Sequence, residues 1–125
     1  MNQTEQRIFD LVRSELTDEL IPKSYRRLVN SRFCGHCHHA SLAMYILLGR
    51  KERGYKLQKA IDDNEITHYW LTNSNYEIID PTAEQYSELN RPFPYHKEKG
   101  RASYRQTKAT KMIIENVRDK LEESS

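Results

Sequence analysis

The chain has 125 residues, of which 37% are hydrophobic and 30% charged, and its net charge is +2 at neutral pH. This length and composition predict a single domain, residues 1–125, with one modest core. The small net charge identifies no class of partner by itself. No apolar run has membrane-spanning length, and residues 1–6 lack the basic start and apolar stretch of a secretion signal. We therefore expect a cytoplasmic protein without a membrane partner, in which both cysteines stay reduced.

The N-terminal half predicts helices. Apolar residues recur at helical spacing over about residues 4–20, which predicts an amphipathic helix that stops before Pro22. A short helical piece is expected over residues 24–29. A second long helix is predicted from about His38 to Leu48; it is apolar nearly all round and should therefore be buried. Gly49 suits the position just past its end.

The C-terminal half predicts strands followed by a helix. Tyr55 to Leu57 is a weak strand candidate, whereas residues 67–72 and 76–80 are stronger and are joined by a hairpin turn at residues 73–75. Residues 84–89 suit a short helix or an irregular segment, and the prolines of residues 91–94 predict a loop. The last helix is expected over about residues 107–122. Its buried side should be formed by Met112, Ile113, Val117 and Leu121.

Three residues have the side chains of a cysteine-nucleophile triad. Cys37 begins the predicted buried helix, His68 lies in the first strong strand, and Asp80 ends the second. A helix N-terminus favours thiolate through its positive dipole and unpaired amides, and the same amides could bind an oxyanion. Histidine would serve as the base, and a carboxylate would fix its tautomer.

The hairpin supplies a reason for His68 and Asp80 to meet. If the turn is centred on Ser74, facing residues have numbers that sum to 148, so His68 faces Asp80 and Trp70 faces Ile78. Side chains directly opposed on two strands have Cβ atoms about 5 Å apart, which allows a hydrogen bond. A shift of one residue in register would weaken this pairing.

These segments resemble a known superfamily. The run Cys34-Gly35-His36-Cys37-His38, followed by His-Tyr-Trp-Leu and by Ile-Asp-Pro-Thr-Ala-Glu-Gln-Tyr, resembles papain-like cysteine enzymes, and more closely their transglutaminase-like branch. It is also similar to small uncharacterised bacterial and phage proteins. The resemblance covers about residues 33–86. It implies an α+β fold with a papain-like or transglutaminase-like core, in which the buried helix packs on a small antiparallel sheet with helices at both termini.

The resemblance also implies roles for the three residues. Cys37 would be the nucleophile, His68 the base and Asp80 the orienting group of a cysteine-dependent hydrolase or acyltransferase. Such an enzyme acts on an amide or related acyl bond, as proteases, deamidases and transglutaminases do, with a protein or peptide substrate and no cofactor. Papain-type enzymes place a glutamine before the nucleophile as an oxyanion donor, but no glutamine lies between Gln6 and Cys37. Trp70, His36 and Cys34 are candidates for auxiliary or substrate-binding roles.

Several other interpretations fit the same residues. Cys34 and Cys37 have the spacing of a redox pair, of a haem attachment site before His38, and of two zinc ligands. Other zinc ligands would come from the remaining histidines, which are His36, His38, His39, His68 and His96. Each triad residue could equally be structural, since buried cysteine commonly acts as a small hydrophobe.

A basic segment gives a non-catalytic alternative. Residues 91–111 contain seven lysines and arginines against one glutamate, with Phe93, Tyr95 and Tyr104 interleaved. Basic side chains alternating with aromatic rings can contact nucleic acid, and basic ones an acidic protein surface. The chain could then be a binding module rather than an enzyme.

Overall fold

The computed structural model describes residues 1–17, 36–63, 65–87, 92–98 and 100–123. The predicted helical piece at residues 24–29 lies outside them. The described α-helices are α1 (Gln3–Ser14), α3 (Cys37–Leu47), α4 (Glu84–Ser87) and α5 (Lys108–Glu123). Three strands, β1 (Lys56–Ile61), β2 (Thr67–Thr72) and β3 (Ile78–Ile79), form an antiparallel sheet in the order β1-β2-β3. Two 3₁₀ helices are η2 (Arg50–Arg53) and η3 (Tyr95–Lys97).

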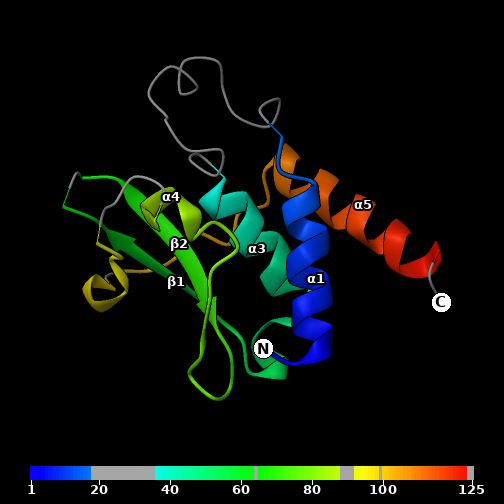
Figure 1. Cartoon of the computed structure of the whole chain (residues 1–125), viewed down its shortest axis with the longest axis horizontal. Coiled ribbons are helices and arrows are strands. Elements are labelled where there is room, and N and C mark those ends of the chain that lie inside the picture. The colour runs from blue at the N-terminus through cyan, green and yellow to red at the C-terminus, as the bar shows by residue number, and fades with distance from the viewer. Residues whose placement is uncertain (18–35, 64, 88–91, 99, 124–125) are drawn as a thin grey trace.

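The elements are stacked so that α3 lies in the middle. Figure 1 shows the sheet on one side of α3 and the pair α1 and α5 on the other, and α3 contacts both layers. This arrangement confirms the predicted α+β class, with a buried helix packed on an antiparallel sheet. It also explains why α3 is apolar nearly all round, because a helix between two layers has no face left for water.

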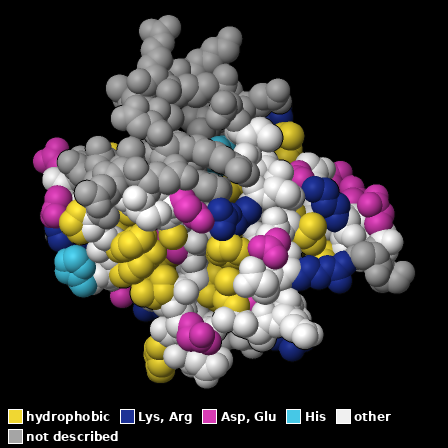
Figure 2. Space-filling model, viewed as in Figure 1, with side chains coloured by type: hydrophobic (Ala, Val, Ile, Leu, Met, Phe, Trp, Pro, Cys, Tyr) yellow, Lys and Arg dark blue, Asp and Glu magenta, His cyan; other side chains and the backbone are white. Residues whose placement is uncertain are grey.

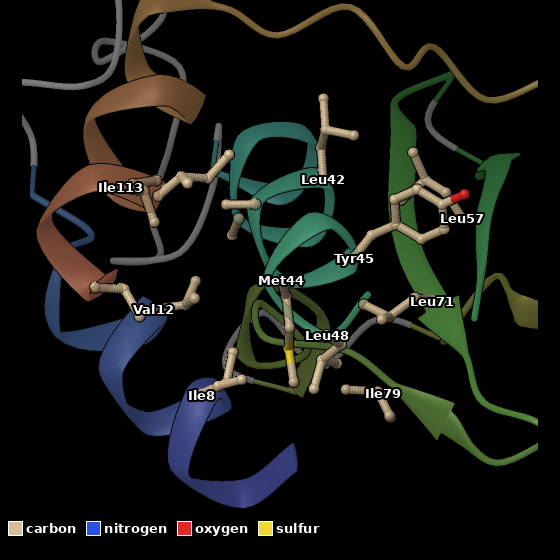
Figure 3. Close-up of a cluster of buried hydrophobic side chains, with 14 of the residues drawn as sticks. Ile8, Val12, Leu42, Met44, Tyr45, Leu48, Leu57, Leu71, Ile79 and Ile113 are labelled. Carbon is tan, nitrogen blue, oxygen red and sulfur yellow. The ribbon is translucent and has the colours of Figure 1, made fainter. Parts of the chain in front are cut away.

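The hydrophobic core fills both sides of α3. Figure 3 shows Tyr45 of α3 directed toward Leu57 and Leu71 of the sheet, while Val12 and Ile113 approach α3 from the two outer helices. All five side chains are buried. The core therefore holds α3 in a fixed position relative to the sheet, which fixes the position of its first residue.

Helix α1 begins as its sequence predicts and ends earlier than expected. Asn2 and Glu5 form a capping box, in which each side chain accepts a hydrogen bond from the other residue's amide. The helix ends at Ser14, although the apolar pattern predicts an end near residue 20. The Ser14 hydroxyl donates to the Leu11 carbonyl, and the amide of Leu16 bonds three residues back. These tighter bonds end the helix, while Leu16 remains buried in the core.

Helix α5 confirms the predicted last helix with one error. Ile113 and Val117 are buried as expected, but Met112 is 44% exposed. Its neighbour in sequence, Ile113, takes the core position, and adjacent residues of a helix point about 100° apart. The outer surface of α5 carries charges of both signs, as Figure 2 shows in the same view as Figure 1. No helix in the described parts of the chain is both long and apolar enough to cross a membrane.

Strand β1 is longer than the sequence indicates. The sequence predicts a weak strand ending at Leu57, but β1 runs to Ile61 and pairs with β2 along its whole length. Lysines at two of its six positions obscure the strand pattern. Pairing with a strongly apolar neighbour outweighs this weak local preference.

The β2–β3 hairpin forms with a different register from the one predicted. Leu71 pairs with Ile79 and Thr72 with Ile78, so the numbers of facing residues sum to 150 rather than 148 (71 and 79). The Asn73 side chain accepts hydrogen bonds from the amides of Asn75 and Glu77. Asn73 therefore stays in the ladder opposite Glu77, and the turn is centred one residue later than expected.

The turn has the geometry of a three-residue hairpin loop. The Tyr76 amide donates to the Asn73 carbonyl, and Tyr76 has a positive φ of 61°. A β-turn closed by a left-handed residue is a common form of such loops. The numbers of facing residues sum to two more than predicted, and an even change leaves every side chain on the face that the sequence predicts. His68 and Asp80 therefore remain on the same face of the sheet.

Candidate active site

Cys37 is the first residue of α3 and is buried, with 8% of its surface exposed. His36 precedes it as the N-cap but makes no capping hydrogen bond with its side chain. The predicted start of the helix at His38 is thus one residue late. The described Cys37 is a free thiol. Cys34, the other half of the predicted pair, lies outside the described residues.

Cys37 approaches β2 along the edge before Leu71. Because β3 pairs only with Leu71 and Thr72, the rest of this edge of β2 has no strand beside it in the described structure. The amide of Asn73 bonds toward β3, so the carbonyls of Thr67 and Tyr69 also point to this edge, since backbone groups alternate along a strand. Helix α3 covers them: the Ser41 hydroxyl donates to the Tyr69 carbonyl at 3.1 Å.

The Cys37 thiol contacts the same edge of β2, one turn of α3 before Ser41. Its sulfur lies 3.7 Å from the Thr67 carbonyl oxygen, which is the peptide group that leads into His68. Cys37 and Ser41 are four residues apart, so they lie on one face of α3. That face positions the thiol beside the strand residue that carries the imidazole.

His68 and Asp80 form a buried hydrogen-bonded pair. Nε2 of His68 lies 2.7 Å from Oδ2 of Asp80, and their side chains are 0% and 3% exposed. Continuing the observed register places Asp80 opposite Trp70, so His68 and Asp80 are diagonal neighbours on one face. Their predicted contact is confirmed, although the direct opposition predicted for them is wrong.

The remaining oxygen of Asp80 is held by the turn that follows. Oδ1 accepts hydrogen bonds from the amide of Thr82 at 3.0 Å and from its hydroxyl at 3.4 Å. This is the ordinary chemistry of an Asx turn, in which a side chain bonds the backbone two residues on. It fixes the carboxylate so that Oδ2 faces His68.

The second nitrogen of His68, Nδ1, takes no part in the bond to Asp80. Nδ1 is buried and has no conventional hydrogen-bond partner among the described residues. Besides Asp80, the side chain that interacts with the imidazole through both hydrogen bonding and charge is Cys37. His68 thus interacts with both a carboxylate and a thiol, which are the partners that the sequence predicts for it.

These neighbours raise the pKa of His68. Burial alone would lower it, because an imidazolium loses hydration, but hydrogen bonds and charges from Asp80 and Cys37 outweigh burial. The pKa rises from 6.5 to about 9. His68 therefore favours the protonated form near neutral pH, as the hydrogen-bonded partner of a carboxylate does.

Aromatic rings surround the imidazole. The rings of Trp70 and Tyr86 lie with centroids 5.9 Å and 4.8 Å from that of His68. The Tyr95 hydroxyl donates to Oδ2 of Asp80 at 2.7 Å, so this oxygen accepts from both Tyr95 and His68. The sequence predicts that Trp70 shares the face of His68, and this is confirmed. Figure 2 shows hydrophobic side chains gathered over the sheet side of the molecule.

Sequence reasoning missed Tyr86, Thr82 and Tyr95 as site residues. It assigns Tyr95 to the basic segment as a ring that could contact nucleic acid, but the Tyr95 hydroxyl turns inward to Asp80. The sequence carries no local pattern for this contact, because Tyr95 lies 15 residues after Asp80 in a proline-rich loop. Only Thr82 could have been found, since Asp-Pro-Thr is a recognisable turn.

His36, another auxiliary candidate, pairs with a neighbouring histidine of the first turn of α3. Its Nδ1 lies 2.6 Å from Nε2 of His39, and both side chains are buried. Burial, followed by the charges of His36 and His38, lowers the pKa of His39 to about 3. His39 therefore stays neutral near neutral pH, and this pair supports the first turn of α3.

The proposed zinc ligands do not converge in the described structure. Among the residues described, no group of three or more histidine, cysteine or acidic side chains is placed to hold a metal ion. His38 instead bonds the Ser103 carbonyl at 2.9 Å. Arg101 and Arg105 of the basic segment are exposed, and contact with nucleic acid through residues 91–111 stays a prediction.

No family model, curated protein or solved structure matches this chain.

Proposed function

We propose that this protein is a cysteine-dependent hydrolase or acyltransferase that acts on an amide or related acyl bond. Cys37 would be the nucleophile, His68 the base and Asp80 the orienting group. The observation that carries the proposal is that the fully buried His68 bonds a carboxylate at 2.7 Å and also interacts with the thiol of Cys37, at a helix start. A purely structural histidine requires no thiol beside it.

The surrounding fold supports the same proposal. A thiol at the start of a buried helix, packed on an antiparallel sheet that carries the histidine and the carboxylate, is the layout expected of a papain-like or transglutaminase-like core. In this chain the helix lies along the open edge of β2, and that placement lets Cys37 approach His68. The fold assignment at this finer level belongs to the proposal.

The reaction would begin with transfer of the thiol proton to Nδ1 of His68. A histidine with a pKa of about 9 would retain that proton at neutral pH, which leaves the sulfur free to act as the nucleophile. The sulfur attacks the substrate carbonyl carbon, a carbon–sulfur bond forms, and the carbonyl electrons move to oxygen. First-turn amides of α3 point toward the helix start, where they could bind this oxyanion.

The intermediate then collapses to a thioester. The carbon–nitrogen bond breaks, and the imidazolium gives its proton to the departing amine. Water or another amine next attacks the thioester carbon while His68 accepts its proton, and the carbon–sulfur bond breaks to restore the thiolate. Protease, deamidase and transglutaminase chemistry share these steps, and a protein or peptide is the substrate class we propose. The steps require no cofactor.

The test is alkylation of Cys37 by iodoacetamide at pH 6, in a Cys34→Ser background that leaves one thiol. An ordinary thiol, with a pKa near 8.5, is less than about 1% ionised at that pH. A thiolate paired with imidazolium should therefore react at least about tenfold faster in the parent than in a His68→Ala variant. Mass spectrometry of the intact protein measures the rate.

His38→Ala is the matched control, because His38 follows Cys37 directly but bonds Ser103 instead. It should leave the alkylation rate at pH 6 unchanged. If the parent protein reacts no faster than His68→Ala, while both are folded by circular dichroism, the proposed function is wrong.

A further inference from the structure

We propose that Tyr95 is a positioning residue of this site, whose hydroxyl shares one oxygen of the Asp80 carboxylate with His68 and so moderates the pull of Asp80 on the imidazole. The inference rests on the proposed function and adds a fourth member to the site. The hydroxyl oxygen of Tyr95 and Nε2 of His68 each lie 2.7 Å from the same oxygen, Oδ2 of Asp80. With Thr82 on the other oxygen, both carboxylate oxygens accept hydrogen bonds.

The backbone holds Tyr95 firmly over the site. Tyr95 begins η3, and the amide of Lys97 closes this turn on the Pro94 carbonyl at 2.8 Å. The Lys97 side chain forms an ion pair with Asp63, which lies in the loop between β1 and β2. Directly after η3, residue 98 pairs with residue 60 of β1. The segment is thus attached to the β1–β2 loop at Lys97 and to β1 at residue 98.

The ring of Tyr95 is also held by aromatic packing. Its centroid lies 5.1 Å from that of Trp70 in an edge-to-face arrangement and 5.4 Å from that of Phe93 in a stacked one. Trp70 stands beside His68 on β2, so the same rings enclose both donors to Asp80. A side chain fixed by backbone and ring contacts gives a hydrogen bond of defined direction, as a positioning residue requires.

The hydroxyl remains a donor throughout the range in which the protein would work. Burial, followed by the charge of Asp80, its hydrogen bond and the charge of Glu84, raises the pKa of Tyr95 far above its ordinary value. Deprotonation would place two anions side by side. Tyr95 therefore donates to Asp80 whether His68 is neutral or protonated.

Two donors on one oxygen share its electron density, so Tyr95 weakens the attraction of Asp80 for the His68 proton. In Tyr95→Phe the ring remains, Thr82 still holds the other oxygen, and Oδ2 is left to His68 alone. The surroundings of the carboxylate also become less polar, which strengthens its interaction with imidazolium. Both effects raise the midpoint at which His68 loses its proton.

Other titratable groups around the imidazole are unchanged in this variant. Those that face or influence His68 are Cys37 from α3, Asp80 after β3 and Tyr86 from α4. Farther away, Asp62 acts through the hydroxyl of Tyr86. Glu84 acts through Tyr95.

The experiment is an NMR titration of the His68 ring in the parent, Tyr95→Phe and Tyr86→Phe proteins. Tyr86→Phe is the matched control, because Tyr86 also packs on His68 but its hydroxyl donates to Asp62 at 2.8 Å. We expect Tyr95→Phe to raise the His68 midpoint by about half a pH unit or more, and Tyr86→Phe to leave it within about 0.2 unit.

An unchanged or lowered midpoint in a folded Tyr95→Phe protein would overturn the inference, as would an equal shift in Tyr86→Phe. A purely structural role for Tyr95 would lower the melting temperature without moving the midpoint. The alkylation rate of Cys37 in the parent at pH 6 is a separate measurement from the titration. If the titration contradicts the role of Tyr95, the proposed function is therefore unaffected. Conversely, an inert Cys37 removes the proposed function without affecting the titration.

Discussion

Replacing Asp80 by asparagine should make His68 a much weaker base. The Asp80→Asn change keeps the shape of the side chain and the turn at Thr82, but it removes the negative charge 2.7 Å from Nε2 of His68. Burial lowers the pKa of His68, and the charge and hydrogen bond of Asp80 are among the causes that reverse this effect. Asp80→Asn should therefore return the pKa of His68 to 6.5 or lower.

The size of the effect follows from the pKa of His68. Its rise from 6.5 to about 9 corresponds to about 3 kcal/mol of preference for imidazolium over imidazole. Asp80 and Cys37 share this contribution, and they also offset the cost of burying the cation. Removing the carboxylate from a buried pair should in addition lower the free energy of unfolding by about 3 kcal/mol.

NMR titration of the His68 ring in Asp80→Asn measures the pKa directly, and urea denaturation measures the stability. Asp62→Asn is the control, because Asp62 is also buried and accepts from Tyr86, which packs on His68, without itself bonding the imidazole. It should lower the pKa of His68 by less than about half a unit. A folded Asp80→Asn protein whose His68 still titrates near 9 would refute the assignment of Asp80 as the orienting group.

Two further predictions concern stability. In the parent protein, His68 has a folded pKa above its unfolded value of 6.5, so its contribution to stability is complete below pH 6.5 and is lost as pH rises through the folded pKa. Urea denaturation should show stability falling across this range by at most about 1.4 kcal/mol per pH unit, and a flat profile there would contradict the shift. Leu71→Ala should cost about 3 kcal/mol, because Leu71 is fully buried at the contact between the sheet and α3. Met112→Ala, at an exposed position of α5, should stay within about 0.5 kcal/mol in the same assay, and equal losses would show that the core is wrongly described.

The contact between His68 and Asp80 shows how far a sequence argument can reach. The strand alternation places both residues on one face, and that part is correct because side chains alternate whichever way the hairpin closes. The predicted register is wrong, because the numbers of facing residues sum to 150 rather than 148. The Asn73 side chain bonds the amides of two later residues and so shifts the turn. An even change in the sum preserves the face, so the pair forms diagonally.

The approach of Cys37 to His68 could be suspected from the sequence, but local patterns do not determine it. It depends on the edge of β2 before Leu71 having no strand beside it among the described residues, which leaves the carbonyls of Thr67 and Tyr69 for Cys37 and Ser41 to contact. In the observed register the predicted strand 76–80 would face only residues 70–74, so its greater length would not have covered those carbonyls. Which element packs along that edge is decided by contacts between segments far apart in the chain, and this is a tertiary property.

What the sequence determined by itself was the set of elements and the faces they bury, because helical and strand periodicities are local. It placed the α3 helix, β2 and the last helix within a residue of their observed bounds. The tertiary structure alone decided that Tyr95 reaches Asp80 and that β1 extends to Ile61. Those outcomes come from contacts between segments far apart in the chain, whose energies depend on packing and burial rather than on local preference.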